Sequence, residues 1–398
     1  MQEITPQELQ KLLETKKPLF LFDVRSQDQF DRWRIERKGG LDCLNIPYFE
    51  LIERGGKPDF KDSIRAAIQK DLLSKLPKNR QIVVVCAKGD TSNIVAEILR
   101  EERFEAMNLS GGMKAWGSFY DQKWLVRSNE LSILQCIRLS RGCLSYVVTS
   151  KDEAVIIDPF RNAAFYQDLF ASWPVKVRMI FDTHAHADHI SGARTLATHY
   201  QVPYFLHPYD GIHPMDMLPA TFSYEPSWEN RTYPLGKVKI QAIHIPGHTL
   251  GSLAFLVDKR FLICGDSIFI HSLARPDLGG KAKAWTPLFY HSLQSLLQLP
   301  DDLLVLPAHF GSLEESNDDY SFGKTLGELK RTNEELKLIQ KPFQGFDQYV
   351  SEHLPEFPPD YIDIKRVNLG LLSLSEEKAE ELELGKNLCA TKRLSRSD

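Results

Sequence analysis

The sequence FDTHAHADHI, from Phe181 to Ile190, brings three histidines and two aspartates into ten residues. It begins where the apolar run VRMIF ends, and the helical pattern ISGARTLATHY follows it. The polar residues therefore occupy a loop between a predicted strand and a predicted helix. Loops at strand ends are where α/β proteins usually place their chemistry. The stretch is a candidate metal-binding loop, and by itself it leaves open whether it binds one ion or two.

Three more ligand-type residues occur in the same setting, each after an apolar run. His248 follows IQAIHIPG, Asp266 follows RFLICG and His309 follows LLVLPA. Neutral imidazoles and carboxylates bind zinc, iron or manganese, whereas an all-oxygen calcium site would not need histidine. The sequence therefore predicts a metal centre at the ends of four strands, with the candidate ligands His184, His186, Asp188, His189, His248, Asp266 and His309.

The N-terminal part of the chain has a different pattern. PLFLFDVR and IVVVCAKG are predicted strands, and TSNIVAEILREE is a predicted amphipathic helix. Strand and helix in alternation predict a parallel α/β sheet. Thr5 is expected to cap a first helix that Pro6 opens.

From about Leu131 onward, short strands separated by turns give way to alternating strands and helices. This order predicts a second α/β domain, built as a layered sandwich. We expect domains at residues 1–125 and 126–370, followed by a polar tail at 371–398 that forms a solvated helix or is disordered.

Composition and charge limit the kinds of molecule that this protein is expected to bind and the location in which it is expected to work. The 398 residues are 42% hydrophobic, and the net charge is −4 with both signs interspersed, which argues against a nucleic-acid surface. No apolar run reaches the roughly 18 residues that would span a bilayer, and no signal or transit peptide is apparent. The six cysteines form no C-x-x-C pair, which favours a reducing, cytoplasmic location over a disulfide framework. Whether the chain forms a homodimer is left open.

The motifs H-x-H-x-D-H, PGHT, GD and PAH together resemble the metallo-β-lactamase superfamily, over roughly residues 131–370. The resemblance implies an αββα sandwich with the metal in the cleft between the sheet edges. These motifs are specific for the superfamily and much less so for its reaction.

Two members of that superfamily imply different metal sites. Glyoxalase II-type thioesterases hold two zinc ions and hydrolyse a thioester. One ion would be bound by His184, His186, His248 and Asp266, and the other by Asp188, His189, His309 and Asp266. Persulfide dioxygenases imply about one Fe(II) per chain on His184, His248 and Asp266, the two-histidine, one-carboxylate triad. In that case the remaining residues of the cluster would orient the iron ligands and water, namely His186, Asp188, His189 and His309.

The segment after Asp266 resembles the dioxygenases more closely. GDSIFIHSLARPDLGG and GELKRTNEEL are similar to the corresponding dioxygenase segments, and Arg275 and Asp277 match an Arg-x-Asp pattern found there. The resemblance places Arg275, Asp277 and Asp188 among the candidate catalytic residues. A structural salt bridge beneath the cleft is the alternative interpretation of Arg275 and Asp277.

Cys86 ends a predicted strand and begins a loop that leads into a helix. A thiol at this place faces backbone N–H groups and the positive end of the helix dipole, which stabilise an anion. The candidate anion-binding residues are those of the loop itself, namely Ala87, Lys88, Gly89, Asp90, Thr91 and Ser92. A buried structural cysteine is the alternative.

LFDVRSQDQF, NIPY, CAKGDTS and LSGGMKAW together resemble a rhodanese domain, over about residues 1–122. The resemblance implies that Cys86 carries sulfane sulfur as a persulfide. Many single-domain rhodaneses have arginine where this chain has Thr91, and related phosphatases need that arginine. Its absence here argues against phosphatase chemistry.

Taken together, the two resemblances imply an enzyme of hydrogen sulfide metabolism. It would oxidise a small, glutathione-like thiol persulfide with O₂ to thiol and sulfite, and Cys86 would interconvert thiosulfate, thiol persulfide and sulfite. One alternative is a dinuclear zinc hydrolase of glyoxalase II type with a regulatory rhodanese module. Another is a non-catalytic sulfur carrier or sensor.

Overall fold

The computed structural model describes residues 3–15 and 17–390. The chain divides into two compact units, one made of residues 1–121 and 138–141 and the other of residues 122–137 and 142–398. The main division at residue 121 lies close to the boundary expected at residue 125. None of the helices in the described part of the chain has the length and apolar character that a membrane crossing requires.

The first unit is built on one parallel sheet, as predicted. Its strands pair in the order β1-β5-β4-β2-β3. Their bounds are β1 (Glu3–Ile4), β2 (Leu19–Asp23), β3 (Asp42–Asn45), β4 (Gln81–Val85) and β5 (Ala106–Leu109). The helices are α1 (Pro6–Glu14), α2 (Gln27–Arg32), α3 (Tyr48–Gly55), α4 (Phe60–Ala67), α5 (Asp90–Glu101) and α6 (Gly112–Gly117), with a π-helical turn at Ile68–Leu72.

Both faces of this sheet are buried, which explains the nearly continuous apolar runs of its strands. Phe22 and Val84 pack into the core on one face, and Leu21 and Val83 pack into the core on the other. Thr5 caps α1 as expected: its side chain accepts a hydrogen bond from the Glu8 N–H.

The second unit contains two sheets with helices outside them, which confirms the predicted αββα sandwich. The first sheet runs in the order β12-β11-β10-β9-β8-β7-β6, with bounds β6 (Asp121–Val126), β7 (Ser132–Arg138), β8 (Cys143–Ser150), β9 (Glu153–Ile157), β10 (Lys176–Phe181), β11 (Tyr204–Leu206) and β12 (Glu225–Pro226). The second sheet runs from β13 to β18 in sequence order, with bounds β13 (Thr232–Leu235), β14 (Val238–His244), β15 (Leu253–Val257), β16 (Phe261–Ile263), β17 (Leu304–Leu306) and β18 (Lys324–Thr325).

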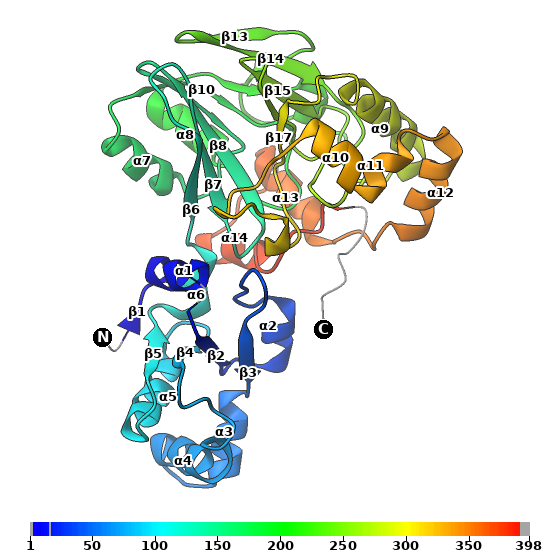
Figure 1. The fold of residues 1–398 in the computed structure, drawn as a ribbon. Helices are drawn as coiled ribbons and strands as arrows, with labels where there is room; N and C mark the ends of the chain where they lie inside the picture. The colour runs from blue at the N-terminus through cyan, green and yellow to red at the C-terminus, as the bar shows by residue number, and fades with distance from the viewer. Residues whose placement is uncertain (1–2, 16, 391–398) are drawn as a thin grey trace. The chain divides into compact units, whose positions relative to one another are not determined.

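The helices of this unit form the outer layers. Their bounds are α7 (Ala163–Ala171), α8 (Ala193–Tyr200), α9 (Ala282–Leu296), α10 (Leu326–Thr332), α11 (Glu334–Leu338), α12 (Phe343–His353), α13 (Asp360–Asn368) and α14 (Glu376–Leu382). In Figure 1, α7 and α8 lie beside the first sheet, while α9, α10 and α11 lie beside the second.

Aromatic side chains from both sheets meet in the core between them. The ring of Phe181, at the end of β10, lies 5.0 Å from that of Phe205 in β11 and 4.9 Å from that of Phe255 in β15. The strand that leads into the candidate metal-binding loop is therefore anchored at its last residue by packing between the sheets.

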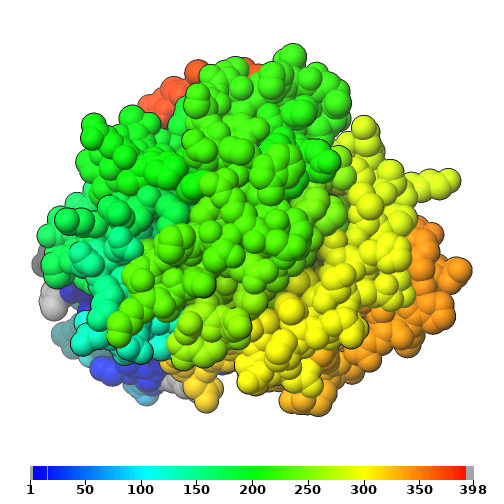
Figure 2. All heavy atoms as spheres, turned by 90° about the horizontal axis from the view of Figure 1, so that it is seen from above, coloured from blue at the N-terminus to red at the C-terminus, as the bar shows by residue number. Residues whose placement is uncertain are grey.

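The ligand-type side chains lie beneath the surface of this unit. Figure 2 shows one face of it, where the green segment near residues 200–250 lies beside the yellow segment near residues 280–310. The exposed fraction of each predicted ligand side chain is at most 2%.

Within the segment expected to be a solvated helix or a disordered tail, the structure has the helix α14, in which only Ala379 is buried, and this helix also contacts the rest of the second unit. Ala379 of α14 packs with Ile190 and Ile364, and Glu383 accepts a hydrogen bond from the Ile190 N–H. Glu383 also pairs with Arg161, at 3.1 Å. The charges that made this segment look solvated are thus partly used in contacts with the second unit; residues 391–398 lie outside the described residues.

Candidate functional site

The ends of four strands place the candidate metal ligands in neighbouring groups. His184 follows β10, His248 follows β14, Asp266 follows β16 and His309 follows β17. Because these ends lie at the same edge of the sandwich, residues far apart in the sequence become neighbours.

His184, His248 and Asp266 form one group. One ligand atom from each lies within 4.8 Å of the other two. Nε2 of His248 is 3.2 Å from Oδ2 of Asp266, and Nε2 of His184 is 3.9 Å from the same oxygen. These three atoms are buried and have no hydrogen-bond partner. Buried polar atoms that face one another without partners fit a bound cation.

A second group surrounds Asp188. Nδ1 of His189 lies 3.2 Å from one Asp188 oxygen, and Nε2 of His309 lies 2.7 Å from the other. Cys143, at the start of β8, belongs to the same group, with Sγ 3.4 Å from Asp188 Oδ2. The sequence predicted the histidines and the aspartate of this group but not the cysteine.

His186 belongs to a third group. Its Nε2 lies 3.0 Å from Oδ1 of Asp158 and 3.8 Å from Oδ1 of Asp182. Burial alone would lower the pKa of His186, but Asp158 outweighs it and raises that pKa to about 9. Asp158 directly follows β9. The rule that identified the other candidates, a ligand-type residue just after an apolar strand, could therefore also have identified Asp158.

Two further contacts orient the histidines of the first group. Thr183 Oγ1 is 3.0 Å from His184 Nδ1 and 3.0 Å from both oxygens of Asp158. The threonine hydroxyl donates to the carboxylate, so it accepts from the Nδ1–H of His184 and leaves Nε2 free of a proton. The backbone carbonyl of Arg275 lies 2.7 Å from Nδ1 of His248. This carbonyl accepts the Nδ1–H and likewise leaves Nε2 of His248 free of a proton.

Arg275 and Asp277 form a buried, bidentate ion pair. Arg275 Nε and Nη2 donate to the two Asp277 oxygens at 2.6 and 2.8 Å, and Nη2 also donates to the carbonyl of Pro355 at 2.8 Å. The Arg275 side chain is fully buried. These contacts correspond to the salt-bridge alternative, and the part of Arg275 that faces His248 is its backbone carbonyl.

The charges at the centre are strongly coupled. Burial opposes ionisation of Asp188 and Asp266, but His309 outweighs it and holds the pKa of both carboxyls well below its usual range. Burial likewise opposes the charge on His309, while Asp188 and Asp266 raise the pKa of this imidazole well above its usual value. Burial, together with His186, lowers the pKa of His184 well below its usual value, which keeps the ring neutral and able to bind a metal.

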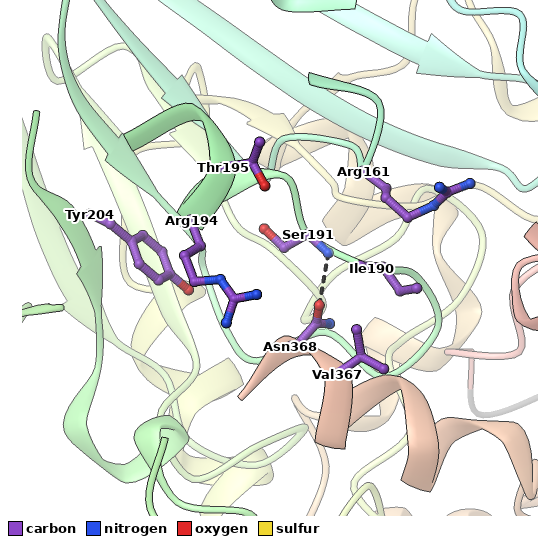
Figure 3. Close-up of a pocket in the computed structure, with 8 residues that line it drawn as sticks. All are labelled: Arg161, Ile190, Ser191, Arg194, Thr195, Tyr204, Val367 and Asn368. Carbon is purple, nitrogen blue, oxygen red and sulfur yellow. Dashed lines mark hydrogen bonds between the residues drawn. The ribbon is translucent and has the colours of Figure 1, made fainter. Parts of the chain in front are cut away.

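Asn368, at the end of α13, forms hydrogen bonds with the main chain of the loop that carries His184, His186 and His189. Its Nδ2 donates to the carbonyls of His186 and His189, each at 2.9 Å, and its Oδ1 accepts from the Ser191 N–H. Asn368 and Ser191 both line a cavity of about 100 Å³. Figure 3 shows the hydrogen bond between these two residues. The sequence offered no signal for Asn368, because it lies 182 residues from His186.

In the first unit, Cys86 lies between β4 and α5, where the sequence predicted an anion-binding loop. Its Sγ accepts from the Gly89 N–H at 3.1 Å, and the Ser92 hydroxyl lies 3.1 Å away. Among the other predicted loop residues, Ala87, Lys88 and Asp90 are exposed and Thr91 is half-buried.

Gly112 packs directly beneath the Cys86 loop. Its φ is +57°, and a Cβ there would lie 2.4 Å from the Cys86 carbonyl oxygen, so only glycine fits. Met113 N–H donates to that carbonyl and Lys114 N–H donates to that of Ala87. The GG pair of LSGGMKAW thus supports the loop, and the Trp116 side chain of the same segment packs in the core.

Both units match known families. Residues 5–118 match the model of the rhodanese-like domain, and residues 140–309 match that of the metallo-beta-lactamase superfamily. A hydroxyacylglutathione hydrolase from Pectobacterium carotovorum is 30% identical over 209 residues, which cover 50% of this chain and 77% of the relative.

Two solved structures are similar to the chain. A metallo-beta-lactamase from Staphylococcus aureus has a TM-score of 0.53 at 24% identity and covers 62% of this chain and 75% of its own. ETHE1 from Myxococcus xanthus has a TM-score of 0.50 at 21% identity and covers 63% of this chain and 99% of its own. At these identities the two structures support the fold alone.

Proposed function

The chain belongs to the metallo-β-lactamase superfamily and carries a rhodanese-like domain ahead of that part, and from this premise we propose that it oxidises a small-molecule thiol persulfide. The reaction is R-SSH + O₂ + H₂O → R-SH + sulfite + 2 H⁺, in the second unit, with about one Fe(II) per chain. The first unit transfers sulfane sulfur through Cys86.

The observation that carries this proposal is the grouping of His184, His248 and Asp266. Each offers one buried atom without a hydrogen-bond partner, and no fourth side chain belongs to that group among the described residues. Two histidines and one carboxylate are the ligand set of non-haem Fe(II) oxygenases, in which the iron keeps positions open for substrate and O₂. His186, the additional ligand that a dinuclear hydrolase would use, is grouped with Asp158 and Asp182 instead.

The residues around the triad fix its geometry. Thr183 and the Arg275 carbonyl each bind the Nδ1 side of a ligand histidine, which directs both Nε2 atoms toward Asp266. The three ligand side chains are buried, and a site closed to water protects a reactive sulfur species from side reactions.

The rhodanese-like unit supplies the substrate in this proposal. The Cys86 thiolate attacks the outer sulfur of thiosulfate, the S–S bond breaks, and sulfite leaves with the bonding electron pair. A small thiol then takes the outer sulfur from the Cys86 persulfide, which yields R-SSH and restores the thiolate. Donors at Gly89 and Ser92 lie within 3.1 Å of Cys86 Sγ and stabilise its negative charge.

A second candidate function is hydrolysis of an S-acylglutathione thioester. The observation that favours it is the 30% identity to a hydroxyacylglutathione hydrolase. It would use two zinc ions, one of them held in part by the unpartnered Nδ1 of His186.

Oxygen uptake separates the two candidates. Protein purified without oxygen should contain about one iron per chain and consume O₂ when given glutathione persulfide. His248→Ala should lose both the iron and the uptake. Two zinc ions, no uptake by the iron-loaded protein and rapid hydrolysis of an S-acylglutathione would overturn the oxidation and establish the hydrolase.

The role of Cys86 is tested on the same protein. Cys86→Ser should abolish O₂ uptake driven by thiosulfate and glutathione but keep the uptake driven by preformed glutathione persulfide. Cys43→Ser is the matched control, because Cys43 is an exposed cysteine of the same unit. Unchanged sulfur transfer in Cys86→Ser would remove Cys86 from the reaction.

A further inference from the structure

Lys365, in the middle of α13, is a lysine buried inside the second unit. It is 3% exposed, and none of the described residues forms a hydrogen bond or an ion pair with its ammonium group. A buried charge without a partner is unfavourable, so such a group fits a bound anion. We propose that Lys365 binds the anionic sulfur group of the substrate and of the product, a persulfide and sulfite, beside the His184–His248–Asp266 triad. This inference rests on the proposed function, in which both molecules are sulfur anions.

One face of α13 is directed toward the metal centre, and Lys365 lies on that face. Residues three and four positions apart share a helix face, so Tyr361, Lys365 and Asn368 point the same way. The Tyr361 hydroxyl lies 3.7 Å from Sγ of Cys389, and this sulfur lies within 4.8 Å of a ligand atom of Asp266. Asn368 donates to two main-chain carbonyls of the candidate metal-binding loop. Lys365 thus lies between two residues that both contact the surroundings of the ligands.

The charge of Lys365 also acts on the triad. Burial, followed by His186, lowers the pKa of His184, and the positive charge of Lys365 acts in the same direction. Burial lowers the pKa of Lys365 itself, while Asp210 and Cys389 oppose burial and favour the ammonium form. An ammonium group within electrostatic reach of a metal ligand is well placed to attract an anion that binds the metal.

Asp210 acts on Lys365 without being its direct counter-ion, because its oxygens are engaged elsewhere. Oδ2 accepts from the Ala185 N–H and from the Thr249 hydroxyl, each at 2.7 Å, and Oδ1 accepts from the Gly251 N–H at 2.9 Å. These neutral donors hold the carboxylate in place. The three N–H donors of the Lys365 ammonium group are therefore left for a ligand.

A sulfur anion fits the charges at this position. Two neutral imidazoles and one carboxylate leave a divalent ion with a net positive charge, and Lys365 adds a second positive charge close by. A persulfide or a sulfite ion compensates both. A neutral thioester group would leave the ammonium group uncompensated, so Lys365 suits the oxidation better than the hydrolysis.

The test measures the binding of sulfite to the iron-loaded full chain by titration calorimetry without oxygen. Lys365→Met has a side chain of similar length and no charge, and we expect the Kd for sulfite to rise about 10- to 100-fold, as for a lost charge-assisted hydrogen bond. Lys378→Met is the matched control, because Lys378 is exposed on α14 and paired with Glu381. It should bind sulfite like the wild type. A sulfite affinity that is unchanged in Lys365→Met at normal iron content would overturn the proposal.

A structure of the wild type covers the case in which Lys365→Met does not fold or does not keep its iron. In iron-loaded crystals soaked with sulfite, we expect a sulfite oxygen within about 3.2 Å of Nζ of Lys365. Sulfite that is bound only at other places, or Nζ paired with a protein carboxylate in the complex, contradicts the anion site.

The same measurements separate this inference from the proposed function. Sulfite binding that depends on Lys365, in protein that consumes no O₂ with glutathione persulfide, would keep the anion site and remove the oxidation. Normal oxygen uptake together with equal sulfite affinities of the wild type and Lys365→Met would keep the oxidation and remove the anion site.

Discussion

The backbone carbonyl oxygen of Arg275 lies 2.7 Å from Nδ1 of His248, and the Arg275 side chain is held by Asp277 behind it. The arginine therefore contacts a candidate metal ligand only through its main chain, while its charged group pairs with Asp277. This relationship gives Arg275 a role that can be separated experimentally from direct contact with substrate.

Replacing Arg275 by lysine should damage stability and metal binding together. Lysine cannot make the bidentate pair, so Asp277 is left poorly compensated, and we expect the free energy of unfolding to fall by about 3 kcal/mol. Loss of the ion pair should also displace the backbone carbonyl of residue 275, which orients His248. We therefore expect metal affinity to fall about tenfold. Denaturant unfolding and chelator competition measure the two effects. Lost turnover with unchanged stability and affinity would instead mean that Arg275 acts directly on the substrate.

Thr183 provides a milder test of ligand orientation. Thr183→Val removes the hydroxyl that links His184 to Asp158, so we expect metal affinity to fall by about 10- to 100-fold. Thr183→Ser keeps the hydroxyl and should bind metal like the wild type. Equal affinities of the valine and serine variants, measured by chelator competition, would show that the hydroxyl does not orient His184.

The Ser92 hydroxyl should matter for sulfur transfer in the first unit. It lies 3.1 Å from Cys86 Sγ and 2.7 Å from Asn108 Oδ1. Ser92→Ala removes a donor to the sulfur, and we expect thiosulfate sulfurtransferase turnover to fall about tenfold, as for a charge-assisted hydrogen bond. Asn108→Ala is the control, because it breaks the same buried contact while keeping the hydroxyl at Cys86. Equal losses in both variants would indicate a structural role only.

The sequence predicted those parts of the site that depend on local pattern. His184, His248, Asp266 and His309 each follow an apolar strand, and parallel or adjacent strand ends meet at one edge. The Cys86 loop follows the same rule, since its neighbours Gly89 and Ser92 lie within six residues.

The parts that were not predicted depend on contacts between distant segments. Cys143 opens an apolar strand, where a cysteine is more often a small buried hydrophobe, and only its bridge to His309 brings it to the metal ligands. Cys389 lies in a segment that composition assigned to a solvated tail, yet its carbonyl accepts from the Arg275 N–H. Hydrophobic patterning carries no information on such pairings.

We expect His207, which stacks on His244 and is not a candidate metal ligand, to make the stability of the second unit depend on pH. The two rings are stacked with centroids 4.3 Å apart, and Nδ1 of His207 accepts from the Tyr209 N–H. Burial, helped by the neighbouring His244, lowers the pKa of His207 to about 4, whereas in the unfolded chain it is about 6.5.

Between these two pKa values the unfolded chain binds a proton at His207 that the folded protein does not. Stability from this group is therefore present above about pH 6.5 and is lost as the pH falls toward 4. We expect His207→Asn, which keeps an acceptor for Tyr209 but cannot be protonated, to reduce the loss of stability between pH 7 and pH 5 by about 1 kcal/mol. Urea unfolding of wild type and variant at both pH values measures this difference. Parallel losses in the two proteins would show that His207 is protonated equally easily in the folded and unfolded states, and the stacked pair would then have no part in the acid sensitivity of this unit.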